Sequence, residues 1–297
     1  MRLLTYRLEP DGQDLLGVTC KREREYFYPL EQFGVKFRDM NDLIVNITPE
    51  QRKILEKEAA VLGHASLRYD RVIHRAPIPH PRHDIICLGI NYLEHAAESS
   101  RYKKEAFGGE RPYAVYFSKR VNEAVADGDV IPSYKELTDS LDYEAELAVI
   151  IGKDAKNVSR EEAFDYVFGY TIMNDVSARD VQTRHQQWYF GKSLDGFTPM
   201  GPVILTADEV ASPPVLGIKS RVNTELRQNS STDRMIFDIP HVIEELSAGM
   251  VLEAGSIISM GTPSGVGMGF VPPRFLKPGD VVECKVQEIG TLRNIVK

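Results

Sequence analysis

The stretch LDYEAELAVIIG, residues 141–152, sets the fold class of this chain. Apolar residues fill both faces of the segment after Glu146, which is typical of a strand in the interior of a sheet. Side chains two positions apart project from the same face of a strand, so we expect Glu144 and Glu146 to lie side by side. An interior strand with two carboxylates at its start predicts a strand-rich protein with a functional site at one end of the sheet.

These two carboxylates need a cation nearby. Burying unpaired negative charge is costly unless a metal or a base neutralises it, and carboxylate oxygens suit Mg²⁺, Mn²⁺ or Ca²⁺ better than zinc. Asp175 follows the next apolar run, where the strand pattern ends, and offers a third oxygen ligand. We therefore predict a divalent-metal site made by Glu144, Glu146 and Asp175. The alternative is an exposed strand end, because acidic pairs are common on protein surfaces.

Polar residues that could hold an acidic substrate follow the third carboxylate. Arg179, Gln182, Lys192 and Asp195 come next along the chain, and they would supply positive charge and hydrogen bonds to a substrate lying against the metal. Lys119, in YFSKR, is a further candidate for substrate binding. The alternative for Lys119 is a solvated lysine at a strand end.

A candidate general base lies in GINYLEHAAE, directly after the apolar strand IICLGI. His95 and Glu98 are three residues apart and share one face of a helix. A carboxylate beside an imidazole orients the ring and raises its basicity, which is the usual arrangement for proton transfer. The alternative is a solvated pair on a helix surface.

Four motifs, in order and with matching spacing, resemble the fumarylacetoacetate hydrolase family in its catalytic domain. They are E-A-E at 144–146, N-D-V-S-A-R-D-V-Q at 174–182, G-K-S-L-D-G-F-T-P-M-G-P at 191–202 and G-T-P-S-G-V-G at 261–267. The resemblance runs from about residue 85 to residue 297. It implies an α+β, strand-rich fold, the family's mixed β-sandwich roll with a small N-terminal α/β domain.

The resemblance also implies roles for particular residues. His95 and Glu98 match the family's water-activating dyad, and Thr262 lies in a loop that contacts substrate oxygens. Lys192 would act with Arg179 and Gln182 on the negative charge that develops in the substrate. The resemblance implies Mg²⁺ or Mn²⁺ as the cofactor, and Ca²⁺ can take the same place in a crystal.

The expected activity is metal-dependent hydrolysis of a carbon–carbon bond in a 1,3-diketo acid, such as an acylpyruvate or a fumarylacetoacetate-like compound, through an enolate. An oxaloacetate-type decarboxylase and a 2-hydroxyhepta-2,4-diene-1,7-dioate isomerase on the same site remain open. A non-catalytic binder of metal or carboxylates is the alternative from another class. Ile90 stands where many relatives have arginine, which removes one contact for a substrate carboxylate. The polar segment 99–113 has the composition of a lid that orders over substrate, and a disordered surface loop is the alternative.

Composition narrows the remaining classes. The chain has 297 residues and a formal net charge of −7, and no basic patch suggests nucleic acid as a partner. Its apolar runs are too short to cross a membrane and its start lacks a signal-peptide core, so we expect a cytoplasmic protein that acts on a small keto acid. Cys20, Cys87 and Cys284 read as reduced structural thiols. By analogy with the family we expect a homodimer.

The chain divides most naturally in HRAPIPHPRHD, residues 74–84, where prolines prevent a helix. We predict a small domain at 1–78 and a catalytic domain at 79–297. A metal role for His74, His80 and His83 in this stretch is disfavoured because the prolines scatter the rings.

Three helices carry sequence signals. One begins after Thr48 with a capping box and ends at Gly63. The second is expected over 160–168, capped by Ser159, and the third starts after Asp238 and ends at Gly249.

Overall fold

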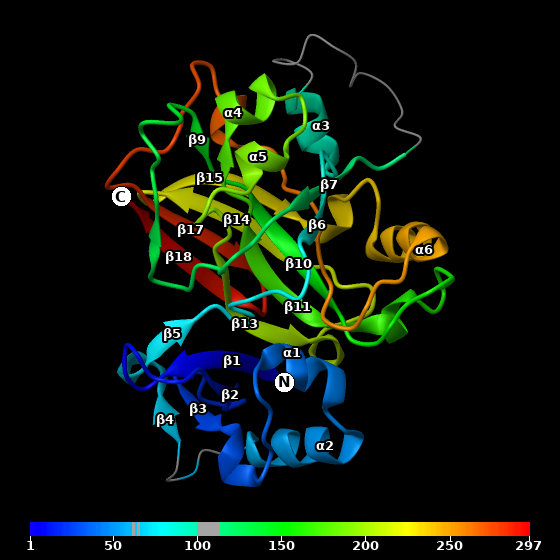
Figure 1. Cartoon of the computed structure of the whole chain (residues 1–297). Helices are drawn as coiled ribbons and strands as arrows, with labels where there is room; N and C mark the ends of the chain where they lie inside the picture. Colours follow the sequence, from blue (N-terminus) through cyan, green and yellow to red (C-terminus); the bar gives the residue numbers. More distant parts are fainter. Residues whose placement is uncertain (61–62, 64–65, 100–112) are drawn as a thin grey trace.

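The computed structural model of the protein describes residues 1–60, 63, 66–99 and 113–297 (Figure 1). Its largest sheet is mixed, and β5 pairs with β1 beside the main path. In order across the sheet, the strands are β4 (Leu67–Arg68), β3 (Tyr26–Pro29), β2 (Leu15–Thr19), β1 (Arg2–Arg7), β13 (Met200–Thr206), β11 (Val167–Asn174), β10 (Ala145–Ile151), β16 (Ile257–Ser259), β6 (Ile85–Leu88) and β7 (Tyr116–Lys119), with β5 at Ile73–Arg75.

A second sheet packs against the centre of the first. Its strands, in order, are β15 (Glu225–Ser231), β14 (Gly217–Val222), β17 (Val281–Val286), β18 (Gly290–Val296) and β8 (Val130–Ile131). Strands β14 and β17 contact β10. The two sheets enclose a common core, which confirms the predicted strand-rich β-sandwich roll.

Strand β10 is the interior strand that its sequence predicts. It lies between β11 and β16, antiparallel to both, and every residue of it is buried. Leu147 and Val149 pack in one hydrophobic core, whereas Ala148 and Ile150 pack in another on the opposite face. The run is apolar throughout because both faces of the sheet are covered.

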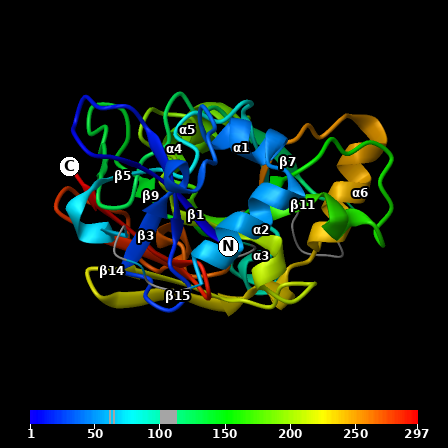
Figure 2. The ribbon, with the colours of Figure 1, turned by 90° about the horizontal axis from the view of Figure 1, so that it is seen from below.

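The N-terminal part of the chain forms the lower part of the molecule in Figure 1, and Figure 2 shows it from below. Helices α1 (Met40–Asn46) and α2 (Pro49–Glu58) lie there with β1 to β5. Strand β1 pairs with β13, so one continuous sheet connects this part with the rest of the chain. The division at residue 78 stays a prediction.

The helix predictions have mixed outcomes. Helix α2 is confirmed, with the capping box between Thr48 and Gln51, but it ends at Glu58, before the predicted Gly63. Helix α6 (Ile239–Gly249) is confirmed, with Asp238 as its N-cap.

The helix predicted over 160–168 is wrong. A 3-10 turn covers Ala163–Tyr166, and β11 begins directly after it. Val167 pairs with Ile151 in the central sheet. Local helix signals give way here because the strand pairing buries the apolar end of the segment.

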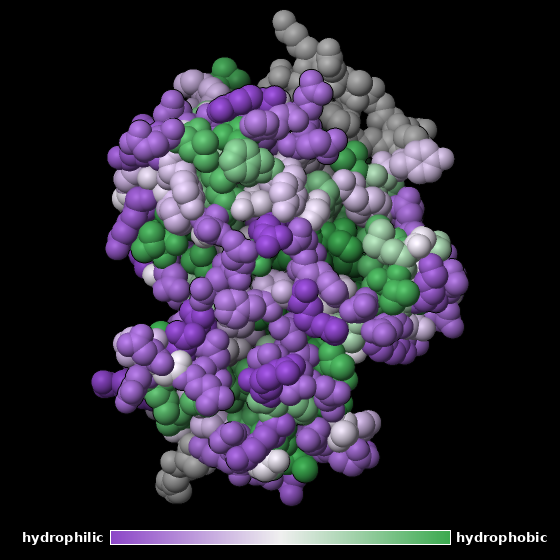
Figure 3. Space-filling model, viewed as in Figure 1, coloured by the Kyte–Doolittle hydropathy of each residue, from purple (hydrophilic) through white to green (hydrophobic). Residues whose placement is uncertain are grey.

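Three more helices surround the mouth of the site: α3 (Leu93–Ser99), α4 (Arg179–Arg184) and α5 (Tyr189–Lys192). Figure 3 shows hydrophilic side chains over most of the visible face, interrupted by several apolar areas, one of which lies beside α5. Within the described ranges, no helix is long and apolar enough to span a membrane.

Candidate metal-dependent active site

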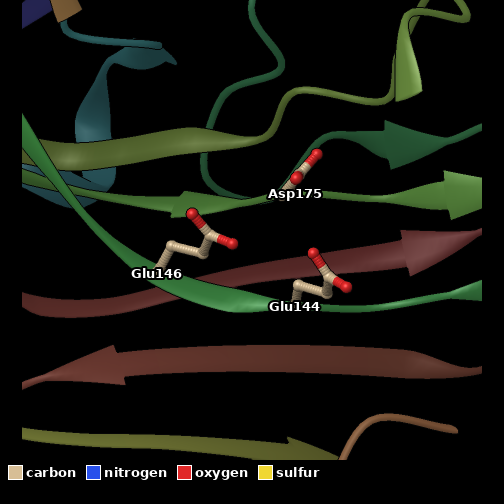
Figure 4. Close-up of side chains that lie close together, drawn as sticks. All are labelled: Glu144, Glu146 and Asp175. Atoms are coloured by element: carbon tan, nitrogen blue, oxygen red, sulfur yellow. The ribbon is translucent and has the colours of Figure 1, made fainter. Parts of the chain in front are cut away.

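The antiparallel pairing of β10 and β11 brings the predicted carboxylates together. Ala145 is paired with Asn174, so the neighbours Glu144, Glu146 and Asp175 meet at one end of both strands. One ligand oxygen of each lies within 4.8 Å of the others, and all three side chains are buried (Figure 4). The alternative of an exposed strand end does not apply to this acidic pair.

Two of the three carboxylates are neutralised by basic side chains. Lys192 Nζ lies 2.6 Å from Glu144 Oε2 and 2.7 Å from Asp175 Oδ2. Arg179 Nη2 lies 2.7 Å from Glu144 Oε1. Burial opposes the charge on Lys192, but Asp175 and Glu144 outweigh it and raise the pKa of the lysine to about 12. Burial likewise disfavours the charge on Glu144, yet Arg179 and Lys192 hold the pKa of that carboxyl below its usual range.

Glu146 is different. Its Oε2 accepts hydrogen bonds from Ser259 Oγ at 2.5 Å and from the Gly261 amide at 3.0 Å. Among the described residues no basic group lies within 4.0 Å of its carboxylate. Burial, and then the charges of Asp175 and Glu144, raise the pKa of Glu146 well above its usual value. A buried, all-oxygen set with one uncompensated carboxylate fits a divalent cation.

Glu144 and Glu146 line a pocket. One part of the wall is polar and the other is apolar. The polar residues are His95, Glu144, Glu146, Arg179, Gln182, Thr183, Lys192 and Thr262, and the apolar ones are Leu88, Gly89, Ile90, Phe117, Trp188 and Met268. The pocket therefore suits a small anionic ligand with a short carbon chain.

His95 of the predicted His–Glu pair lines the same pocket, and Glu98 holds its ring from behind. His95 Nδ1 lies 2.9 Å from Glu98 Oε2, and His95 is almost fully buried. Glu98 Oε1 accepts a hydrogen bond of 3.0 Å from the Gly265 amide, in the predicted glycine-rich loop. The pair is thus held by the fold and is not a solvated pair on a helix surface.

The remaining predicted substrate residues differ in position. Arg179 and Gln182 both line the pocket, and Arg179 Nη1 donates to Gln182 Oε1 at 3.2 Å. Thr262 also lines it, but its hydroxyl donates to the Ala145 carbonyl and accepts from Gln228 Nε2. Asp195 is exposed and bonds Asn122, away from the pocket, so it is no substrate contact in this structure.

Lys119 is fully buried behind Asp175. Its ammonium donates to Asp175 Oδ1 at 2.7 Å and to the Val176 carbonyl at 3.1 Å. Burial lowers the pKa of Lys119, although Asp175 opposes this. Lys119 is not among the residues that line the pocket, and its contact with substrate stays a prediction.

Residues 100–112 of the predicted lid lie outside the described part of the chain. The histidines of the proline-rich stretch bond elsewhere: His74 to the Tyr69 carbonyl, and His83 to Glu253. Across the described residues, the acidic triad is the one cluster able to hold a metal ion.

Asp142, Gln228 and Trp188 also lie at or beside the site and were not predicted from the sequence. Asp142 stands two positions before Glu144, between the apolar residues Leu141 and Tyr143, and this position was a usable signal. Gln228 lies on the second sheet and binds the Ala145 amide through Oε1, which no sequence pattern indicates. Trp188 packs edge-on against Phe117, with ring centroids 5.2 Å apart.

A buried acidic triad, a lysine that bridges two of its members and the neighbouring His95–Glu98 pair are typical of an enzyme active site. Comparison with known proteins agrees. Residues 84–297 match the family model described as fumarylacetoacetate (FAA) hydrolase C-terminal, and the chain belongs to this family of enzymes.

The most similar proteins carry several chemistries. The chain is 49% identical over 233 residues to the oxaloacetate tautomerase YisK of Bacillus subtilis (strain 168), covering 78% of this chain and 76% of that protein. It resembles the fumarylacetoacetate hydrolase of the psychrophilic Exiguobacterium antarcticum, with 37% identity, a TM-score of 0.80 and 99% of each chain covered. A probable 2-hydroxyhepta-2,4-diene-1,7-dioate isomerase of Mycobacterium abscessus has 31% identity and a TM-score of 0.78, with 100% of this chain and 98% of that chain covered.

Proposed function

We propose that the protein is a divalent-metal-dependent enzyme that interconverts the keto and enol forms of a small 2-keto dicarboxylic acid, with oxaloacetate as the substrate. The observation that carries this proposal is that His95, held by Glu98, lines the same pocket as Glu144, Glu146 and Lys192. The similarity to an oxaloacetate tautomerase supports the choice of substrate.

Glu144, Glu146 and Asp175 would hold Mg²⁺ or Mn²⁺, since both ions prefer oxygen ligands. When bound, the ion supplies Lewis-acid polarisation of a keto oxygen. Glu146, whose carboxylate oxygen accepts only from a hydroxyl and a backbone amide within the described part of the chain, supports this assignment.

Arg179, Gln182 and Lys192 face the substrate from the polar wall. Arg179 and Lys192 bind its carboxylates and stabilise the enolate oxygen, because fixed donors in a dry site need no reorganisation when charge develops. Gln182 uses its oxygen to hold Arg179, which leaves its amide group for the substrate.

His95 moves the proton. Its Nδ1 is bound to Glu98, so Nε2 is the ring nitrogen left for the substrate. His95 takes a proton from the carbon next to the keto group, leaving an enolate, and the enol forms when a proton returns to the oxygen. The apolar side of the pocket, including Phe117 and Trp188, limits access of the water that hydrolysis would need.

Carbon–carbon hydrolysis of an acylpyruvate is the second candidate, because the same dyad could activate water. Decarboxylation of oxaloacetate and isomerisation of a hydroxydienedioate need no water and use the same donors. The three relatives described above are named for three different reactions, so the similarity by itself does not choose among these chemistries.

Turnover decides among these reactions. The protein is incubated with Mg²⁺ or Mn²⁺ and with oxaloacetate, an acylpyruvate or 2-hydroxyhepta-2,4-dienedioate, each repeated with EDTA. A tautomerase speeds the relaxation of the ultraviolet absorbance of the oxaloacetate enol without loss of total oxaloacetate. Two acid products from the acylpyruvate would select the hydrolase, and release of carbon dioxide would select the decarboxylase.

The dyad has its own test. Replacing His95 by alanine (His95→Ala) removes the proton carrier, so turnover should fall by about 10²–10⁴-fold. Binding of Mn²⁺, followed by calorimetry, should stay unchanged because His95 is not one of the acidic ligands. A binder without catalysis would show no turnover in the unaltered protein either.

A further inference from the structure

We propose that Asp142 is a positioning residue that fixes Arg179 and the loop at residues 265–269 relative to one another. Asp142 lies at the end of β9 (Leu141–Asp142) and is fully buried. It does not line the pocket. Its role would be to hold the substrate-binding arginine and the support of the His–Glu dyad in one geometry, and in that sense it rests on the proposed function.

Each oxygen of the Asp142 carboxylate accepts two hydrogen bonds. Oδ1 accepts from the Tyr143 amide at 2.9 Å and from the Gly267 amide at 2.7 Å. Oδ2 accepts from the Met268 amide at 3.0 Å and from Arg179 Nε at 2.9 Å. A buried carboxylate with donors at both oxygens is rigidly oriented, since rotating it would break bonds at each.

On one side, Asp142 orients Arg179. The arginine begins α4, and Asp142 holds its Nε edge while Nη2 lies 2.7 Å from Glu144 Oε1. The planar guanidinium has a fixed fork of donors, so a partner at Nε sets the direction of the remaining ones. Asp142 thereby decides how Arg179 points toward the triad and the pocket.

On the other side, Asp142 anchors the loop that supports the dyad. The Gly265 amide donates to Glu98 Oε1 at 3.0 Å, and the Tyr143 hydroxyl donates to the Gly265 carbonyl at 2.8 Å. A Cβ added at Gly267 would come within 2.6 Å of Asp142 Oδ1, so the close approach requires glycine. Met268, whose amide binds Asp142, is part of the pocket wall.

Asparagine cannot replace this carboxylate without conflict. An amide offers one acceptor oxygen and one donor group. Whichever way the asparagine side chain turned, its amino group would face two N–H donors, because each oxygen of Asp142 accepts from two. Either Arg179 or the loop must then move.

The test compares Asp142→Asn with the matched control Asp180→Asn. Asp180 follows Arg179 in the chain, whereas Asp142 contacts Arg179 in space. Asp180 bonds Thr138 and the Val181 amide and does not line the pocket. Trp188 is the single tryptophan of the chain and lines the pocket, so its fluorescence reports binding without any turnover. The probes are Mg²⁺ alone, and oxalate in the presence of saturating Mg²⁺.

We expect Asp142→Asn to bind Mg²⁺ as the unaltered protein does, because the triad is intact. Its affinity for oxalate should fall by about 10–100-fold, the range for losing a hydrogen bond to a charged group. The KM for oxaloacetate should rise by a similar factor, and kcat should fall as well because the Glu98 support shifts. Asp180→Asn should keep both oxalate affinity and KM.

A double variant adds a readout that general destabilisation would not give. If Asp142 acts through Arg179, adding Asp142→Asn to Arg179→Gln should weaken oxalate binding far less than it does alone. Full additivity would overturn the coupling. The whole inference would be overturned if Asp142→Asn bound oxalate with an affinity within about twofold of the unaltered protein. A change of that size is expected for residues that do not interact.

Gly267→Ala serves if Asp142→Asn does not fold. It keeps the carboxylate and pushes the loop away, so it should lower oxalate affinity and kcat together. If the unaltered protein binds oxalate but does not turn over oxaloacetate, the proposed function fails while the titrations still decide the role of Asp142. An unaltered protein that binds no oxalate with Mg²⁺ would overturn both.

Discussion

At the scale of single residues, the site is a balance of buried charges. Asp142, Glu144 and Asp175 each have a basic partner at 2.6–2.9 Å, whereas Glu146 relies on a hydroxyl and an amide. Burial penalises a charge that is not neutralised. The buried carboxylates therefore lower the stability of the metal-free fold and favour the binding of a cation.

Glu146→Gln tests this balance. Glutamine keeps an oxygen for Ser259 and Gly261 but removes the uncompensated charge. The metal-free variant should unfold about 2–4 °C higher for each kcal/mol of burial cost removed, because burial raises the pKa of Glu146 and folding therefore disfavours its charged form. Mg²⁺ should raise the melting temperature of the unaltered protein and leave that of the variant unchanged in scanning calorimetry.

Equal Mg²⁺ stabilisation of both proteins would contradict a role for Glu146 in metal binding. NaCl at matched ionic strength serves as the control for a general salt effect on the melting temperature.

At the scale of elements, the connection from β6 to α3 shapes the apolar wall. Gly89 follows β6 and touches the indole of Trp188, which precedes α5. A Cβ on residue 89 would lie 2.9 Å from Trp188 Cζ3 and 3.1 Å from Val115 Cβ. The glycine therefore allows the tryptophan to close one side of the pocket.

Gly89→Ala should displace Trp188. We expect a cost of about 1–3 kcal/mol in the free energy of unfolding, typical of overpacking, together with a higher KM and a shifted fluorescence maximum. Gly249→Ala is the matched control, since a Cβ there meets nothing within 4 Å. An unchanged KM and fluorescence maximum for Gly89→Ala would show that Trp188 does not shape the pocket.

At the scale of the whole molecule, one continuous sheet runs from the N-terminal strands to the candidate site through the β1–β13 pair. The site thus sits on a rigid support, while α3, α4 and α5 carry residues of its mouth. The outer surface over α4 and α5 includes Tyr189 and Phe190, which are 42% and 45% exposed.

We predict a homodimer, from the family resemblance and from this exposed apolar surface. Light scattering should give twice the mass of one chain, unchanged on dilution through the micromolar range. A mass of one chain across that range would contradict the prediction. Phe190→Ser should weaken the dimer if this exposed surface is the interface. An intact dimer would place the interface elsewhere.

Much of the site could be read from the sequence. Glu144, Glu146 and Asp175 stand next to apolar strand runs, and the period of a strand puts the first two on one face. His95 and Glu98 lie at helical spacing, and the capping box at Thr48 predicts the start of α2. These signals are local, so a single segment of chain contains them.

Other features depended on the tertiary structure. The segment 160–168 has helix signals, yet pairing with β10 turns its end into a strand. The burial of Lys119 behind Asp175, and the joining of Arg179, Gly267 and Met268 at Asp142, bring together residues far apart in the chain. Sequence patterns by themselves determined which groups are candidates for the chemistry, because the signals are local, whereas only packing between distant segments decided which of them face the pocket and which hold the others in place.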